Sequence, residues 1–229
     1  MNPRGISMDP ADLARRLEHA VLHPQATRQD VLLGVQTAVR WGVRALVVKP
    51  CHVTLAAREL AETYVKVVTV VGFPHGGHTV ATKVAETREA VAHGAEEVDM
   101  VLDLGALRDR DLATVFYETR SVVDAARGRP VKVILETAYL TDAEKRLACR
   151  IAARAGAAYV KTSTGFGPAG ATVADVALLR RVVGRRLGVK AAGGIRTYTD
   201  AVALLEAGAD LLGTSHTDAI LREAAARVA

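Results

Sequence analysis

Aromatic residues and cysteines are scarce in this 229-residue sequence: 4% of the residues are aromatic, and only two, Cys51 and Cys149, are cysteine. So few aromatic rings leave little surface for stacking nucleobases, which argues against a nucleic-acid partner. The two cysteines lie far apart and outside any CxxC or histidine-rich spacing. Neither a disulfide framework nor a structural zinc site is therefore indicated, and we expect both thiols to be buried.

Long hydrophobic runs are also missing. Although 50% of the residues are hydrophobic, no apolar run reaches the roughly 20 residues that a transmembrane helix needs. The first ten residues, MNPRGISMDP, lack the apolar segment of a signal peptide. We therefore expect no membrane partner and a cytoplasmic location. The net charge of +5 includes many arginines spread along expected helices, which favours solvated helix faces with some attraction for anionic metabolites.

Short apolar runs alternate with segments of helical periodicity. The expected strands are Leu17–Leu22, Val43–Val48, Val67–Val71, Val98–Leu102, Val131–Leu135, Tyr159–Val160, Val189–Ala192 and Leu211–Leu212. The expected helices include Thr79–His93, Thr141–Ala155, Thr172–Arg186 and Thr197–Ala207. In the last three, the first threonine precedes a carboxylate by three positions, which is typical of a helix start. This alternation predicts a parallel sheet covered by helices.

Four glycines mark a repeat within this alternation. Gly42, Gly94, Gly156 and Gly208 each follow a helical segment and precede a strand, where glycine adopts the left-handed backbone without a steric clash. They are separated by 52, 62 and 52 residues, enough for two βα units each. The sequence thus predicts an α/β protein with one (β/α)8 TIM-barrel domain over residues 1–229. An open doubly wound sheet is less favoured, because no glycine-rich turn follows the first strand.

Lysine is rare enough that its positions are informative. Only seven of the 30 basic residues are lysine, yet Lys161 and Lys190 both lie near the C-terminal ends of expected strands, where barrel enzymes place reacting groups. A buried lysine, unlike arginine, responds by losing its proton, and two neighbouring ammonium groups favour this further. The neutral amine is a nucleophile toward carbonyls. An ion-paired lysine at the barrel rim explains the positions equally well.

Two further charged residues lie within expected strands. Asp99 is flanked by apolar residues, so its carboxylate needs a partner such as an inward lysine, and both a structural and a general acid/base role fit. Lys132 points either inward beside Glu136 or outward to the helices, with a structural ion pair favoured. His75 and His78 lack a third ligand, so no metal site is predicted.

A candidate anion site follows the last two strands. Gly193-Gly194-Ile195-Arg196-Thr197 precedes a capped helix, and Gly213-Thr214-Ser215 ends the final strand. Glycine N–H groups, a helix N-terminus and a hydroxyl form anion sites at this end of barrels, and phosphate is the expected anion. Tight turns between strands and helices are the alternative explanation for these glycines.

Ordered motifs from about Val68 to about Ser215 resemble the deoxyribose-phosphate aldolase family. The motifs are Val71-Gly72-Phe73-Pro74, Glu97-Val98-Asp99-Met100-Val101, Lys132-Val133-Ile134-Leu135-Glu136-Thr137, Val160-Lys161-Thr162-Ser163-Thr164-Gly165-Phe166-Gly167 and Val189-Lys190-Ala191-Ala192-Gly193-Gly194-Ile195-Arg196-Thr197. The resemblance implies a class I aldolase that cleaves 2-deoxy-D-ribose 5-phosphate to D-glyceraldehyde 3-phosphate and acetaldehyde. It assigns the Schiff base to Lys161, tuning or proton relay to Lys190, and acid/base work with water to Asp99.

The same resemblance implies a small-molecule phosphosugar substrate and no metal or organic cofactor, since the iminium on Lys161 is itself the electron sink. The expected phosphate-site residues, from motif and resemblance together, are Thr164, Gly165, Gly193, Gly194, Arg196, Gly213 and Ser215. The sequence departs from the family pattern at Glu18, Ala20, the Val47–Pro50 segment, Leu211 and His216. A class I aldolase with another aldehyde or phosphosugar preference therefore stays open, as do a noncatalytic phosphosugar-binding barrel and assembly into a homo-oligomer.

Overall fold

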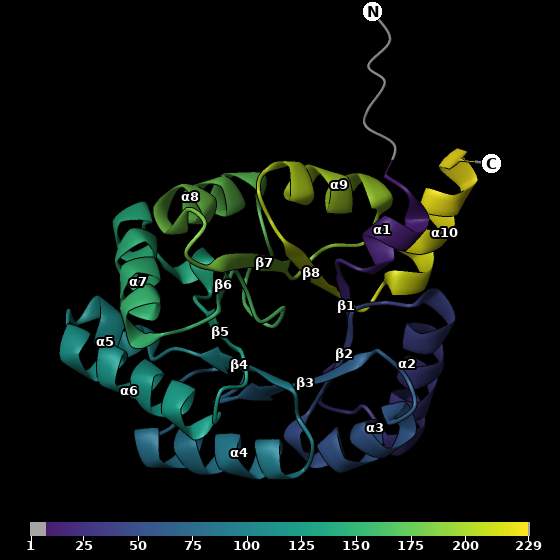
Figure 1. The fold of residues 1–229 in the computed structure, drawn as a ribbon. Coiled ribbons are helices and arrows are strands. Elements are labelled where there is room, and N and C mark those ends of the chain that lie inside the picture. Colours follow the sequence, from purple (N-terminus) through teal and green to yellow (C-terminus); the bar gives the residue numbers. More distant parts are fainter. Residues whose placement is uncertain (1–7, 229) are drawn as a thin grey trace, which may run out of the picture.

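Eight parallel strands close into a barrel in the computed structural model, which describes residues 8–228 (Figure 1). Each strand pairs with its neighbours in chain order, and β8 closes the barrel by pairing with β1. The strands are β1 (Leu17–Val21), β2 (Ala45–Val48), β3 (Lys66–Val71), β4 (Glu97–Val101), β5 (Val131–Ile134), β6 (Tyr159–Lys161), β7 (Gly188–Ala192) and β8 (Leu211–Thr214). The predicted (β/α)8 TIM barrel is therefore confirmed.

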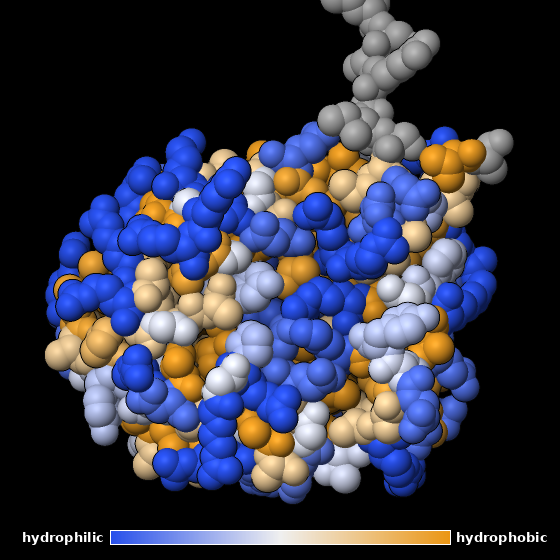
Figure 2. All heavy atoms as spheres, viewed as in Figure 1, coloured by the Kyte–Doolittle hydropathy of each residue, from blue (hydrophilic) through white to orange (hydrophobic). Residues whose placement is uncertain are grey.

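Helices surround the barrel, and hydrophilic side chains cover much of the surface in view, with scattered apolar patches between them (Figures 1 and 2). The helices are α1 (Pro10–Ala14), α2 (Arg28–Trp41), α3 (Val53–Leu60), α4 (Val80–Ala92), α5 (Leu104–Arg108), α6 (Leu112–Ala125), α7 (Asp142–Ala155), α8 (Val173–Val183), α9 (Tyr198–Glu206) and α10 (Thr217–Val228), with 3-10 turns η1 (Pro50–His52) and η2 (Thr137–Tyr139). Within residues 8–228, none of these helices is both long and apolar enough to cross a membrane. Most of the MNPRGISMDP segment lies outside the described residues.

Helix ends follow the sequence signals closely. The hydroxyls of Thr141 and Thr197 form complete capping boxes with Glu144 and Asp200. The hydroxyl of Thr172 also caps its helix, but the Asp175 carboxylate pairs with Lys145 instead of closing a box. The four repeated glycines have positive φ angles, as their positions predict: 62° at Gly42, 106° at Gly94, 90° at Gly156 and 110° at Gly208. The predicted end of one helix is wrong, because α8 ends at Val183 and not at Arg186, whereas the other predicted helix ends lie within one residue of the observed ones.

The Thr141 capping box provides a test of these local signals. The Thr141 hydroxyl accepts from the Glu144 N–H, and the Glu144 carboxylate accepts from the Thr141 N–H at 2.7 Å. Thr141→Ala leaves one of these helix donors unsatisfied, so we expect a loss of about 1 kcal/mol in the free energy of unfolding. Urea denaturation measures this loss, with Thr141→Ser as the matched control. Equal stability of the alanine and serine variants contradicts the assignment.

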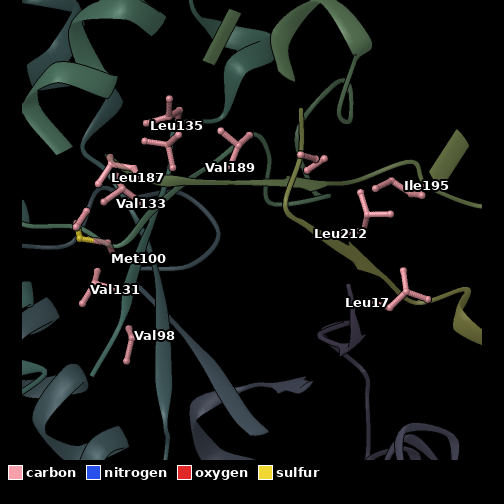
Figure 3. Close-up of a cluster of buried hydrophobic side chains, with 14 of the residues drawn as sticks. Leu17, Val98, Met100, Val131, Val133, Leu135, Leu187, Val189, Ile195 and Leu212 are labelled. Carbon is pink, nitrogen blue, oxygen red and sulfur yellow. The ribbon is translucent and has the colours of Figure 1, made fainter. Parts of the chain in front are cut away.

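Side chains alternate along each strand between the helices and the barrel interior. Outward residues form the main apolar core under the helices, and Figure 3 shows several of them: Val98 and Met100 on β4, Val131 and Val133 on β5, Val189 on β7 and Leu212 on β8. The interior is divided. Next to β2 and β3 it is apolar, with Ala45, Val47, Val68 and Val70 packed together. Charged side chains fill the part formed by β4 to β7, and this is where the predicted lysines lie.

The two cysteines have different environments. Cys149 on α7 is fully buried, and burial raises the pKa of its thiol to about 12. Cys51 is exposed. The prediction of a buried thiol is therefore wrong for Cys51, because the residue falls in η1, on the turn that leaves β2, and not on a packed strand.

Candidate active site

The strand register brings the three predicted catalytic residues together inside the barrel. Asp99 on β4 is paired with Lys132 on β5, and Lys161 on β6 is paired with Lys190 on β7. Lys161 is the last residue of its strand, whereas Lys190 lies at the middle of β7, two residues before its end. Paired residues on neighbouring strands point to the same side of the sheet. The side chains of Asp99, Lys132, Lys161 and Lys190 all point into the barrel interior.

Asp99 is the centre of this cluster and is fully buried. Its Oδ2 accepts hydrogen bonds from the Nζ of Lys161 at 2.8 Å and from the Nζ of Lys190 at 2.6 Å. Its Oδ1 accepts from the Nζ of Lys132 at 2.9 Å. The structure therefore brings together Asp99, Lys161 and Lys190, as predicted, and adds Lys132 as a third lysine on the same carboxylate.

The three lysines differ in how well their charge is compensated. Lys132 lies within 4 Å of three carboxylates: Glu97 at 2.8 Å, Asp99 at 2.9 Å and Glu18 at 3.5 Å. Lys190 donates to two, Asp99 and Glu18. For Lys161, the only ion pair within the described residues is with Asp99. Lys161 thus has the least support for a positive charge.

The pKa values of Lys161 and Lys132 reflect this difference in compensation. Burial lowers the pKa of the Lys161 amine, Asp99 raises it and the positive charge of Lys190 lowers it again, which leaves it at about 8 against the usual 10.5. About a quarter of Lys161 is then neutral at pH 7.5, against about 0.1% at the usual value. Burial acts in the same direction on Lys132, but its three carboxylates outweigh burial and raise its pKa. The Lys161 amine therefore has a neutral, nucleophilic fraction near neutral pH, whereas the Lys132 amine stays charged.

Asp99 stays ionised at neutral pH. Burial raises the pKa of its carboxyl, but the charges of Lys132, Lys161 and Lys190 outweigh burial and hold the pKa well below 3.8. A carboxylate with so low a pKa pairs with cations and orients donors; it is a weak base and does not carry a proton of its own. Of the two roles left open for Asp99, the structural one, as the partner of buried lysines, fits this environment, and the acid/base role stays a prediction.

A second row of charges supports the cluster from the N-terminal side of the strands. The Arg44 guanidinium donates to Glu18, and to Glu97 at 3.1 Å through Nη1 and 2.5 Å through Nη2. Lys66 reaches Glu97 at 3.2 Å. Lys132 points inward and forms a structural ion pair, as one of its two expected orientations has it, but its partners are Glu97, Asp99 and Glu18. Glu136 is not among them, because it lies beyond the end of β5 and turns toward the next loop.

A cavity of about 230 Å³ opens above the lysines at the C-terminal ends of the strands. Lys161 and Lys190 form part of its lining, whereas Asp99 lies beneath them. All seven predicted phosphate-site residues also line the cavity: Thr164, Gly165, Gly193, Gly194, Arg196, Gly213 and Ser215. Ala20, Leu22, Val47 and Phe166 supply an apolar wall. Ala20 is one of the residues that differ from the family pattern, and it lines the cavity.

The anion side of the cavity is made of closely packed backbone. Gly165, Gly193 and Gly194 have φ angles of 89°, 87° and 77°, in the region that favours glycine. A methyl group on Gly193 would lie 3.3 Å from the Cα of Gly165 and 3.1 Å from that of Gly170, so the loops after β6 and β7 touch here. The N-terminus of α9 contributes less than expected, because Asp200 already accepts from the Arg196 and Thr197 N–H groups.

Three other predicted positions have plain outcomes. His216 is exposed and lines the cavity, with its Nδ1 at 3.2 Å from the Ser215 Oγ, so a packed position for it is excluded. His75 and His78 are exposed in the loop after β3. In the described part of the chain, no three histidine, cysteine, aspartate or glutamate residues cluster so as to hold a metal ion.

Comparison with known proteins places the chain in a family. The model of the DeoC/LacD family aldolases matches residues 9–222. The chain belongs to the DeoC/LacD aldolase family. Deoxyribose-phosphate aldolase 1 from Bacillus licheniformis is 50% identical over 204 residues, which are 89% of this chain and 92% of that protein. The deoxyribose-phosphate aldolase of Thermococcus gammatolerans is 50% identical over 208 residues, again 89% of this chain and 92% of that protein.

Solved structures of family members show the same fold. A putative deoxyribose-phosphate aldolase from Coccidioides immitis superposes with a TM-score of 0.92 at 36% identity, covering 95% of this chain and 87% of that one. The deoxyribose phosphate aldolase of Aeropyrum pernix, described as tetrameric, has a TM-score of 0.88 at 35% identity, covering 93% of this chain and 91% of that one. The resemblance predicted from the motifs is therefore confirmed.

Several residues of this aldolase site were not identified as site residues from the sequence. Leu22, Val47 and Phe166 line the cavity, but ordinary apolar residues carry no signal of their own. Glu18 was noted only as a departure from the family pattern, yet it is fully buried and pairs with Lys190. A glutamate two residues into an apolar strand is the signal that identifies it, since a buried carboxylate requires a cationic partner.

Proposed function

We propose that the chain is a deoxyribose-phosphate aldolase that reversibly cleaves 2-deoxy-D-ribose 5-phosphate to D-glyceraldehyde 3-phosphate and acetaldehyde, through a Schiff base on Lys161. The observation that carries this proposal is the lowered pKa, about 8, of a lysine that lines the cavity above Asp99. The names of the relatives support the substrate, since both aldolases described above are about 50% identical to this chain.

In the proposed reaction, the neutral Lys161 amine adds to the C1 aldehyde of the open-chain sugar, and loss of water gives an iminium. A base removes the proton of the C3 hydroxyl, the C2–C3 bond breaks and its electron pair moves to the iminium as an enamine. D-Glyceraldehyde 3-phosphate leaves at this point. Protonation of the enamine at C2 and hydrolysis then release acetaldehyde and restore the amine.

Asp99 and Lys190 are assigned to the proton transfers of this cycle. Asp99 accepts hydrogen bonds from both Nζ atoms, so it orients the Lys161 amine. Its part in proton transfer, directly or through water, is assigned from the family resemblance. Lys190 lines the cavity beside Lys161 and either relays protons or lowers the Lys161 pKa through its charge. No metal or organic cofactor is assigned, because the iminium supplies the electron sink.

The phosphate group is assigned to the glycine-rich side of the cavity. Gly165, Gly193, Gly194, Arg196 and Ser215 all line the cavity that Lys161 also lines. Thr164 and Gly213 complete this wall. Backbone N–H groups in glycine turns hold dianions well, and a guanidinium adds charge.

Two measurements test the proposed function. Incubation with 2-deoxy-D-ribose 5-phosphate should yield D-glyceraldehyde 3-phosphate and acetaldehyde in equal amounts. Borohydride added with acetaldehyde should trap an adduct on Lys161, visible in peptide mass spectra. A noncatalytic phosphosugar-binding barrel gives neither result. An aldolase of other preference gives the adduct but cleaves another sugar faster, which a kinetic comparison of phosphorylated and unphosphorylated deoxyribose shows directly.

Ser215→Asp tests the phosphate assignment. The exposed Ser215 lines the anion side of the cavity, so an added carboxylate repels the substrate dianion. We expect kcat/KM for the phosphorylated sugar to fall by about 10², because like-charge contacts cost several kcal/mol. Turnover of unphosphorylated deoxyribose should change far less, and Ser215→Ala serves as the neutral control. Equal losses for both sugars would show that the phosphate assignment is wrong.

Three broader expectations accompany the proposal. We propose that residues 1–229 act as one barrel domain. Assembly into a homo-oligomer is proposed by analogy with the Aeropyrum pernix protein, whose structure is described as tetrameric. The cytoplasmic location expected from the sequence stays a prediction.

A further inference from the structure

Glu136 is a buried acidic residue that the proposed reaction does not use. It lies two residues beyond β5, is 3% exposed, and has φ 49° and ψ 64°. This left-handed backbone is uncommon for residues other than glycine, asparagine and aspartate. Such a conformation persists only where the surrounding contacts hold it in place. In this conformation the Glu136 carboxylate reaches Thr164.

Glu136 is hydrogen-bonded to the loop after the neighbouring strand, β6. The Thr164 N–H lies 3.2 Å from both carboxylate oxygens, and the Thr164 hydroxyl donates to Oε2. The same hydroxyl accepts from the Phe166 N–H at 3.0 Å. A methyl group on Gly167 would lie 3.0 Å from the Glu136 carboxyl carbon, so glycine there lets the loop close over the carboxylate. One side chain thereby fixes the start of this loop.

The loop that Glu136 fixes is the one that meets the glycine turn after β7. Gly165 follows Thr164 directly, and its Cα lies 3.3 Å from where a methyl group on Gly193 would stand. Thr164, Gly165 and Gly193 all line the cavity on its anion side, whereas Glu136 does not. A displacement of Thr164 would therefore move Gly165 relative to Gly193 and change the spacing of the backbone groups that face the anion.

We propose that Glu136 is a positioning residue for phosphate recognition: through Thr164 it sets the Gly165 backbone against Gly193, and it does not itself contact the substrate. This inference rests on the proposed function, because the anion is identified there as the phosphate of the sugar. Glu136 lies outside the contacts of Asp99, whose hydrogen-bond partners are the three lysines. Loss of Glu136 should thus weaken phosphate recognition and leave Schiff-base formation in place.

Three variants separate the anchoring carboxylate from the backbone conformation. Glu136→Gly accepts the left-handed backbone and removes the anchor. Glu136→Asn also tolerates this conformation and stays polar, but it is one methylene too short to reach Thr164 in the same way. Glu136→Gln keeps the length and an acceptor oxygen for the Thr164 N–H and is the matched control. Thermal unfolding confirms that each variant folds, and the asparagine variant replaces the glycine variant if the latter does not.

The expected result is a selective loss. Glu136→Gly and Glu136→Asn should raise KM for 2-deoxy-D-ribose 5-phosphate and weaken inorganic phosphate binding in calorimetry, each by about tenfold or more, because small displacements of positioning groups carry costs up to about 10²-fold. Values for Glu136→Gln should stay within about threefold of the unaltered protein. Turnover of unphosphorylated deoxyribose and borohydride trapping of acetaldehyde on Lys161 should change by less than about twofold in all three variants.

Two outcomes overturn the proposal. Equal losses with both sugars, accompanied by slower trapping on Lys161, mean that Glu136 supports the whole catalytic end of the barrel. Unchanged phosphate binding in the folded glycine or asparagine variant means that the loop keeps its position without Glu136. If the unaltered protein does not cleave the phosphorylated sugar, the proposed function fails instead, and inorganic phosphate binding still decides the role of Glu136.

Discussion

Lys161→Arg should abolish cleavage of 2-deoxy-D-ribose 5-phosphate, with kcat falling by about 10⁴ or more, as expected for removal of a catalytic nucleophile. The guanidinium keeps a positive charge beside Asp99 but cannot offer a free amine near neutral pH. Borohydride trapping with acetaldehyde should therefore give no adduct. Progress curves at high enzyme concentration, together with peptide mass spectra, measure both losses.

Lys145→Arg is the matched control for this change. Lys145 pairs with Asp175 between α7 and α8, outside the barrel interior, so the same substitution there should leave kcat unchanged. Thermal unfolding of both variants checks that the larger guanidinium is accommodated. Appreciable cleavage or trapping by a folded Lys161→Arg protein would assign the nucleophile to another lysine, and Lys190 is the first candidate because it lines the same cavity.

Much of this architecture could be predicted because it depends on local signals. The capping threonines Thr141 and Thr197 and the glycines that end helices gave element boundaries, and the spacing of those glycines gave eight strands. Lys161 was identifiable for a related reason. Most basic residues of this sequence are arginine, so a lysine at the end of an apolar strand stands out from the local sequence alone.

The sequence could not show contacts between residues whose proximity depends on the closed barrel. Glu18 on β1 meets Lys190 on β7 because β8 joins the two ends of the sheet. Glu136 points away from Lys132 and toward Thr164 because its backbone is left-handed. No local sequence motif predicts this backbone conformation for a glutamate. Cys51 was wrongly predicted to be buried. Apolar residues near it in the sequence do not show whether the residue lies in the strand itself or in the exposed turn that follows.

The division of the barrel interior distinguishes Lys161, the proposed nucleophile, from Lys132. Lys132 lies among Glu18, Glu97 and Asp99, so charge balance favours its ammonium form. Lys161 lies at the top of the charged part, beside the cavity and with a single carboxylate. The same buried network therefore raises the pKa of one lysine and leaves that of another at about 8. The position of each amine relative to the carboxylates decides the outcome.

Lys190→Leu should lower kcat/KM by about 10³, because it removes both a candidate proton relay and the charge that tunes Lys161. In the unaltered protein, the Lys190 Nζ donates to Asp99 at 2.6 Å and also to Glu18. Without Lys190, Glu18 keeps Arg44 as a partner, so its charge is not left unpaired. Thermal unfolding checks that the variant folds. A loss smaller than about tenfold contradicts a role for Lys190 in proton transfer.

The pH dependence distinguishes tuning by Lys190 from proton relay. In the unaltered protein kcat/KM should rise with pH through about 8, as the Lys161 amine loses its proton. Burial lowers the Lys161 pKa, the negative charge of Asp99 raises it and the positive charge of Lys190 lowers it, so removal of Lys190 moves the Lys161 pKa upward. The ascending limb of the pH–rate profile for Lys190→Gln, a variant expected to keep partial activity, should therefore shift to higher pH. Raising the pH should recover part of its lost activity, whereas loss of a proton relay alone lowers the profile without moving it. A profile with an unmoved ascending limb would exclude electrostatic tuning and leave proton relay as the function of Lys190.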